Sequence, residues 1–207
     1  MLSTILRHFP SLSTTQREQF EALNALYHDW NAKINLISRR DIDNLYEHHV
    51  LHSLGITEAL HFRPGTEIMD VGTGGGFPGI PLAILFPRCQ FHLIDSIGKK
   101  VRVAEAIGTA IGLQNTTFAH RNVTEEKRRF DFVVSRAVMS LPELVALVRK
   151  NIRPGGKNAL PNGLLCLKGG DLQAELRPFK HVSDFWPLYP AFPYTYYEGK
   201  SVVYVQI

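Results

Sequence analysis

The chain has 207 residues, of which 44% are hydrophobic and 20% are charged, and its formal net charge is +4. This composition is typical of a globular protein and excludes collagen-like and disordered chains. The length favours one elaborated domain, and the small positive charge permits a polyanionic partner without requiring one.

Cysteine content and the first residues bear on the cellular compartment. The chain contains 2 cysteines, Cys89 and Cys166, which excludes a disulfide framework and a Cys-rich zinc site and suits a reducing cytosol. There is no run of about 18 apolar residues, and Arg7 and His8 interrupt the N-terminus too early for a signal peptide. We therefore expect a cytoplasmic, soluble monomer with no membrane contact.

Residues 1–62 are predicted to form a helical N-terminal extension. Ser13 and Gln16 have capping-box spacing, and Phe20, Tyr27 and Trp30 recur on one helix face as expected for a core stripe. A second helix is predicted from Asp41 to the breaker at residues 63–65. Two helices cannot bury both apolar stripes alone, so we expect the extension to pack on the rest of the chain.

Residues 63–207 alternate between strand and helix patterns and form the predicted second part of one structural unit. Strands are predicted at 67–71, 89–95, 115–120, 130–135 and 163–168, and helices at 78–86, 99–111 and 141–151. This alternation indicates an α/β fold with a mostly parallel sheet that is covered on both faces. After Pro178 no further helix is predicted, and segments 181–188 and 200–206 should pair antiparallel at the sheet edge.

A glycine-rich segment, DVGTGGGFPG at residues 70–79, follows the first predicted strand. Glycine allows positive φ and close approach of a ligand, and ligands of open parallel sheets bind at the carboxyl ends of the strands. The spacing of Gly74, Gly76 and Gly79 also fits a dinucleotide loop. However, Asp70 would repel a pyrophosphate, whereas it suits the ammonium end of an amino acid. The segment therefore favours S-adenosylmethionine over an ordinary tight turn or NAD.

A second carboxylate, Asp95, ends the next predicted strand. A carboxylate in this position can accept hydrogen bonds from both hydroxyls of a ribose, which NAD and S-adenosylmethionine share. The structural alternative is a helix N-cap, for which Ser96 competes. We place Asp95 in the cofactor site because the glycine-rich segment precedes it in the order that such sites require.

Basic residues at strand ends are the candidate RNA contacts. Arg121, Arg136 and Lys168 each follow a predicted strand and should meet at the cofactor edge, where they could hold RNA phosphates or bases rather than merely extend to solvent. Runs at 99–102, 127–129 and 149–157 fit solvated faces equally well, although we include Lys100 among the RNA contacts.

His48, His49 and His52 have helical spacing, so their side chains could together bind a metal ion. No fourth ligand at a suitable spacing accompanies them, and there is no paired zinc motif. We therefore predict that the chain holds no metal.

Together these motifs resemble one known family. The glycine-rich segment continued to Ile80-Pro81, then Asp95-Ser96-x-x-Lys99-Lys100, Ser135-Arg136-Ala137 and Leu167-Lys168-Gly169, resembles the RsmG (GidB) family of small-subunit ribosomal RNA guanine-N7 methyltransferases. Trp30-Asn31-x-Lys33-x-Asn35-Leu36, and His49 with Ser53, extend the likeness to the N-terminal part. The resemblance implies a class I, Rossmann-like methyltransferase fold with a seven-stranded sheet whose last strand is antiparallel. It also implies small-subunit (16S) ribosomal RNA, or the subunit itself, as partner.

The resemblance also implies roles for individual residues. Arg136 would lie beside the methyl-transfer cleft and orient the reactants, and Lys200, before the last strand, would contact RNA. The cofactor contacts carried over from the family and from the motifs are Asp70, Gly72, Gly74, Gly76 and Phe77 at the methionine end, Asp95 at the ribose, Asn122 and Val123 at the adenine, and Arg136.

Guanine N7 carries a free lone pair, so this chemistry requires alignment rather than a general base. Two other functions share parts of the pattern. A nicotinamide-dependent oxidoreductase would use the same fold and Asp95, but it gives no reason for Asp70, and no hydride-transfer pair is evident. A non-catalytic RNA-binding module would use the basic residues, but it has no need for the glycine-rich segment together with Asp95.

Overall fold

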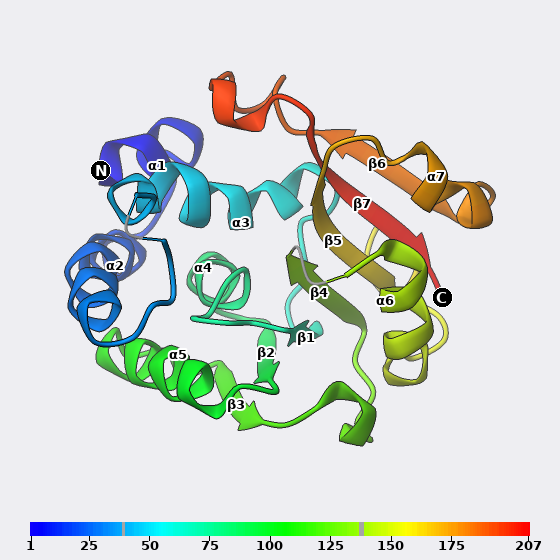
Figure 1. Ribbon diagram of the computed structural model, residues 1–207, viewed down its shortest axis with the longest axis horizontal. Helices are drawn as coiled ribbons and strands as arrows, with labels where there is room; N and C mark the ends of the chain where they lie inside the picture. The colour runs from blue at the N-terminus through cyan, green and yellow to red at the C-terminus, as the bar shows by residue number, and fades with distance from the viewer. Residues whose placement is uncertain (39, 137–138) are drawn as a thin grey trace.

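The computed structural model describes residues 1–38, 40–136 and 139–207, so Ala137 of the predicted motif lies outside the described residues. Its centre is a seven-stranded sheet with the order β3-β2-β1-β4-β5-β7-β6 (Figure 1). The strands are β1 (Glu67–Val71), β2 (Gln90–Asp95), β3 (Thr116–His120), β4 (Phe132–Arg136), β5 (Gly163–Gly169), β6 (Ser183–Pro187) and β7 (Lys200–Gln206).

The pairing of the strands confirms the predicted fold class. The pairs β1–β2, β1–β4, β2–β3 and β4–β5 are parallel, whereas β7 runs antiparallel to both of its neighbours, β5 and β6. The last strand of the chain is thus inserted between two earlier ones. Because β1 has β2 on one side and β4 on the other, the order of the strands reverses around β1, and such a point is where open α/β sheets bind ligands.

Successive strand residues point to opposite faces, and both faces are buried. Ile68 and Phe132 belong to one hydrophobic cluster, whereas their neighbours Met69 and Val133 belong to the other. Apolar residues on both faces are typical of parallel strands that are covered by helices on both sides. This explains why the strands read as nearly continuous apolar runs.

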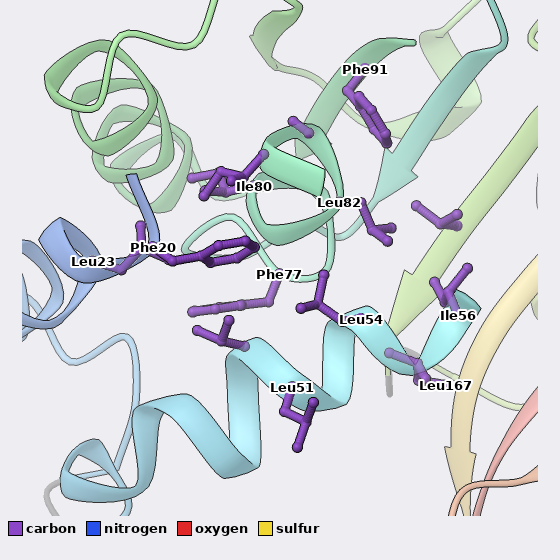
Figure 2. Close-up of a cluster of buried hydrophobic side chains, with 14 of the residues drawn as sticks. Phe20, Leu23, Leu51, Leu54, Ile56, Phe77, Ile80, Leu82, Phe91 and Leu167 are labelled. Carbon is purple, nitrogen blue, oxygen red and sulfur yellow. The ribbon is translucent and has the colours of Figure 1, made fainter. Parts of the chain in front are cut away.

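The helices divide between the two faces of the sheet (Figure 1). The helices α6 (Leu141–Val148) and α7 (Gln173–Leu176) cover one face. The other face carries α1 (Leu2–His8), α2 (Thr14–Lys33), α3 (His52–Leu54), α4 (Gly79–Leu85) and α5 (Gly98–Ala110). In Figure 2, Phe20 of α2 and Leu54 of α3 share one cluster with Phe77 and Ile80. The N-terminal segment therefore packs on the core, and the division at residue 62 stays a prediction.

The start of α2 is the one that the sequence predicts. The side chain of Ser13 accepts a hydrogen bond from the Gln16 backbone nitrogen at 3.2 Å, and the Gln16 side chain accepts one from the Ser13 nitrogen at 2.9 Å. Phe20 and Tyr27 are buried as expected. The Tyr27 hydroxyl also donates to the Gly75 carbonyl at 2.8 Å, so α2 is tied directly to the glycine-rich loop.

The second N-terminal helix differs from the prediction. Instead of one α-helix from Asp41, the segment has a 3₁₀ turn (Ile42–Asn44), a π-helical stretch (Leu45–Leu51), the short α3 and another 3₁₀ turn (Gly55–Glu58). The wider π-helical turns change which side chains share a face, and periodicity of 3.6 residues cannot anticipate this.

Smaller differences concern the ends of elements. The helices α1 and α7 were not predicted, and the prediction of no helix after Pro178 is wrong because residues Thr195–Tyr197 form a 3₁₀ turn. The strand predicted from residue 130 begins at Phe132, since Phe130 makes only an isolated bridge with Ile152. None of the helices in the described parts of the chain has the length and apolar character needed to cross a membrane.

Candidate active site

Two cavities meet at the carboxyl ends of β1, β2 and β4. The larger, of about 450 Å³, is lined by Gly72, Asp95, Asn122, Val123 and Arg136 among others. The smaller, of about 160 Å³, lies between the glycine-rich loop and the N-terminal segment, and its lining includes Leu36, Ile37, Gly72, Gly74, Phe77 and Arg136. Most of the predicted cofactor contacts are therefore brought together, and Gly72, Lys100 and Arg136 line both cavities.

The glycine-rich loop requires glycine for two different reasons. Gly72, Gly74 and Gly76 have φ values of 68°, 57° and 108°, which side chains rarely tolerate. A Cβ on Gly74 would meet nothing within 4 Å, so the loop is open at this position. A Cβ on Gly76 would lie 2.3 Å from the Ile80 side chain. Gly76 therefore serves the packing of the loop against α4, and it lines neither cavity.

Asp70 lies beneath this loop and is fully buried. Its Oδ2 accepts hydrogen bonds from Thr73 Oγ1 at 2.6 Å and from the Gly79 backbone nitrogen at 2.8 Å. Its Oδ1 is buried and meets no hydrogen-bond partner among the described residues. Burial raises the pKa of Asp70 to about 7, although the bonds from Thr73 and Gly79 act in the opposite direction. Asp70 thus holds the shape of the loop and keeps one oxygen available.

Asp95 connects β2 to the same loop. Its Oδ2 accepts from the Gly74 nitrogen at 2.9 Å, and its Oδ1 accepts from the Ile97 nitrogen at 2.8 Å. The N-cap of α5 is Ile97, so Asp95 is not the helix cap that the structural alternative proposed. Because each carboxylate oxygen has a second lone pair, both oxygens can still accept hydrogen bonds from hydroxyl groups of a ligand in the larger cavity.

Arg136, at the end of β4, contacts two residues far away in the sequence. Its guanidinium carbon lies 4.9 Å from the centre of the Phe77 ring, a cation–π distance, and its Nη2 lies 3.2 Å from His49 Nδ1. His49 Nε2 in turn lies 2.7 Å from Asp41 Oδ2. In the sequence, His49 was considered as a member of a histidine face and as part of a family motif, but neither pattern predicted a contact with Arg136. Asp41 was assigned only to the start of a helix.

The comparisons with known proteins agree with one another. Residues 16–185 match the family model described as "GidB: rRNA small subunit methyltransferase G". The chain is 62% identical over 206 residues to the "Ribosomal RNA small subunit methyltransferase G" of Bacteroides thetaiotaomicron, covering 100% of each chain. The protein of the same name from Phocaeicola vulgatus is also 62% identical over 206 residues, covering 100% of this chain and 99% of the relative.

The chain belongs to the GidB family. A solved structure, described as a SAM dependent methyltransferase from Aquifex aeolicus, has a TM-score of 0.56 at 14% identity, covering 78% of this chain and 91% of that one. At this identity the likeness concerns the fold alone, and it agrees with the class I methyltransferase sheet described above.

The predicted basic rim of this GidB-family chain is only partly assembled. Lys100, Arg121 and Arg136 line the larger cavity together. Arg121, however, donates to the Glu126 carboxylate at 3.0 Å. Lys168 is not among the lining residues of either cavity, and its Nζ donates to Glu175 and to the backbone carbonyl of Met139, which lines the larger cavity, at 2.7 Å each. The predicted contact of Lys168 with RNA stays a prediction, and it would require the ion pair with Glu175 to open.

Lys200 also lies away from the lining of both cavities. Its Nζ is 3.9 Å from the centre of the Tyr196 ring, and that ring stacks on His48 with centroids 3.8 Å apart. Burial lowers the pKa of Lys200. This stack could not be predicted from local patterns, because His48 and Tyr196 come from segments about 150 residues apart that only the fold brings together.

The N-terminal segment contributes a wall of the smaller cavity that sequence reasoning missed. Asn31 Oδ1 accepts hydrogen bonds from the Leu36 and Ile37 nitrogens, both at 2.9 Å, and so turns the chain after α2. The turn places the Leu36 side chain 3.4 Å from where a Cβ on Gly75 would be. The available signal was the Asn31 to Leu36 motif itself, which carried no assigned role. The absence of a metal remains a prediction.

Proposed function

We propose that this chain transfers a methyl group from S-adenosylmethionine to N7 of a guanine in small-subunit (16S) ribosomal RNA. The observation that carries the proposal is the meeting of the glycine-rich loop, Asp95 and Arg136 around one cavity, in a chain that shares 62% of its residues with proteins named as small-subunit RNA methyltransferases. We also propose that the chain acts in the cytoplasm and as a monomer.

The residues present fit S-adenosylmethionine. Asp95 offers both carboxylate oxygens to a ribose, and Asn122 and Val123 line the same cavity on the adenine side. At the other end, Gly74 leaves open space, and the unpartnered, buried Oδ1 of Asp70 suits an ammonium group approaching directly or through water. The chain thus offers an acceptor to each polar end of this cofactor.

When bound, S-adenosylmethionine supplies an electrophilic methyl group on its sulfonium. The guanine acceptor needs no proton removed, so the residues of the chain have to align the reactants within about 3–3.5 Å and exclude water. Arg136 lies where it can hold a guanine O6 or a neighbouring phosphate, while Phe77 supports its guanidinium. Asp70 and Asp95 serve binding alone in this scheme.

The oxidoreductase alternative requires a pyrophosphate at the loop above Asp70. A carboxylate buried directly below that loop disfavours such a ligand, which is why the methyltransferase is preferred. Thermal unfolding with each ligand separates the two functions. At about 100 times the dissociation constant, a ligand stabilises by about 2.7 kcal/mol. We expect this with S-adenosylmethionine and not with NAD, and the reverse result would favour the oxidoreductase.

Activity requires its own experiment, which also separates catalysis from RNA binding alone. Radiolabelled S-adenosylmethionine is incubated with the chain and with small-subunit RNA, either free or assembled in subunits that lack the modification. We expect label to enter one of these two substrates. If RNA binds but neither substrate takes up label, the chain is an RNA-binding module and the proposed enzyme activity is wrong.

A further inference from the structure

A chain of polar contacts connects the N-terminal segment to the active site. Asp41 uses its two carboxylate oxygens for two histidines: Oδ1 contacts His48 Nδ1 at 2.5 Å, and Oδ2 contacts His49 Nε2 at 2.7 Å. His48 leads to Glu47, whose carboxylate lies 3.7 Å from His48 Nε2, whereas His49 leads to the active site, because its Nδ1 lies 3.2 Å from Arg136 Nη2. Residues 41, 49 and 136 are thus connected in one line.

The proton positions in this line follow from the chemistry of the partners. A guanidinium has donors and no acceptor, so His49 Nδ1 must present its lone pair to Arg136. The proton of a neutral imidazole then sits on Nε2, where the Asp41 carboxylate accepts it. Burial, and then the charge of Arg136, lower the pKa of His49 to about 4, which agrees with a neutral ring at pH 7.

A neutral partner suits an arginine that has to bind something else. A carboxylate in direct contact would neutralise the guanidinium, as Glu126 does for Arg121. In the described part of the chain, no carboxylate lies within ion-pair distance of Arg136. Instead, the His49 ring and the Phe77 ring fix its direction, and its positive charge stays available to the cavity that it lines.

We propose that His49, itself fixed by Asp41, is a positioning residue that orients Arg136 for methyl transfer. The N-terminal segment is then part of the active site as well as of the core. This inference rests on the proposed function, because its main readout is the methylation rate. It extends that function by giving the contact between the two parts of the chain a catalytic consequence.

Three variants test the proposal in single-turnover methyl transfer at saturating cofactor and RNA. His49→Leu removes the acceptor for Arg136, and because misplacement of about 1 Å can cost up to roughly a hundredfold, we expect a loss of at least about tenfold. His49→Asn keeps an oxygen near the place of Nδ1 and should recover part of the rate. His48→Leu is the matched control, since it removes the other partner of Asp41 without touching Arg136.

The pattern of rates decides the outcome. The proposal expects His48→Leu to stay near the parental rate and His49→Leu to be slowest, with the dissociation constant of S-adenosylmethionine changed less than about threefold, as for a group that acts in the transition state. A parental rate in His49→Leu, or an equal loss in His48→Leu, would overturn it. If the parental chain itself does not methylate RNA, the proposed function fails instead.

A second measurement needs neither activity nor a variant that folds. Nitrogen-15 chemical shifts of the His49 ring at pH 7 report the tautomer in the parental chain. We expect a neutral ring with the proton on Nε2. A proton on Nδ1, or an imidazolium, would remove the acceptor that Arg136 requires and would contradict the proposal even if methylation were intact.

Discussion

The two sides of the larger cavity are built from different kinds of contact. On the β1–β2 side, Asp70 and Asp95 bind backbone nitrogens of the same loop, within a stretch of 28 residues from 70 to 97. On the β4 side, Arg136 depends on His49, 87 residues away. The first side is a local motif that any similar chain can reproduce, whereas the second exists only when the N-terminal segment is folded onto the core.

The largest expected effect falls on the local side. The substitution Asp95→Ala removes the acceptor for two ribose hydroxyls. It also removes the hydrogen bonds that the Gly74 and Ile97 backbone nitrogens donate to Asp95. Each lost bond to a charged group is worth about 1.5–3 kcal/mol, so we expect S-adenosylmethionine to bind roughly a hundredfold more weakly. Calorimetric titration measures this, and Asp184→Ala, an exposed carboxylate on β6, is the control. Unchanged affinity in Asp95→Ala would contradict the placement of the cofactor.

The next effect falls on the long-range side. Arg136→Lys keeps the charge but loses the planar fork, so it cannot keep its contact with His49 and reach the cavity at the same time. We expect single-turnover methylation to slow by about tenfold or more, with little change in the unfolding temperature. Arg102→Ala, an exposed arginine on α5, provides the comparison. A parental rate in Arg136→Lys would mean that charge alone suffices at this position.

The free energy of unfolding should depend on pH through buried groups whose pKa values are shifted in opposite directions. Burial lowers the pKa of both His49 and His92 to about 4, so the unfolded chain binds more protons below its pKa of about 6.5. The free energy of unfolding should therefore fall as the pH drops from about 6.5 to 4, by on the order of 1 kcal/mol per histidine.

Asp70 acts in the opposite direction over an overlapping range of pH. Burial raises its folded pKa to about 7, so its contribution is present below the unfolded value of 3.8 and is lost as pH rises towards 7. Asp70→Asn should then steepen the fall in stability on acidification. Urea unfolding at pH 5 and pH 7 measures both slopes, and an unchanged or shallower slope in the variant would show that Asp70 titrates normally.

The smallest expected effect separates cations that line the cavity from those that do not. Lys100 lines both cavities, whereas Lys168 is held by Glu175. When the logarithm of the RNA binding constant is plotted against the logarithm of the salt concentration, each lost phosphate contact makes the slope less steep by about one unit. We expect this reduction in Lys100→Gln and none in Lys168→Gln. Equal slopes in both variants would show that the ion pair with Glu175 opens when RNA binds.

The features of the fold and of the site that could be predicted from the sequence are mainly those that depend on short segments of the chain. The succession of strands along the chain, the capping box at Ser13 and the grouping of Gly72 with Asp95 depend on local patterns, and the structure has them as expected. The sequence also predicted the antiparallel strand pair at the sheet edge, which the β6–β7 pairing confirms.

What the sequence missed depends on which side chains the fold brings into contact, whether they are near or far apart along the chain. The pairing of Lys168 with Glu175 needs the turn after β5, and the line from Asp41 through His49 to Arg136 needs a π-helical stretch that no simple periodicity predicts. The role of Gly76 in packing on Ile80 was likewise hidden, because a glycine that avoids a clash and one that faces a ligand look the same in sequence.

Methyl transfer to guanine N7 can be tested by identifying the atom that receives the methyl group. Small-subunit RNA that was labelled by the purified chain is digested to nucleosides, which are separated and identified by mass spectrometry. We expect label in 7-methylguanosine, and much less label when Asp95→Ala is assayed at the same concentration of S-adenosylmethionine. Label on another base, on an exocyclic nitrogen or on a ribose oxygen would contradict it.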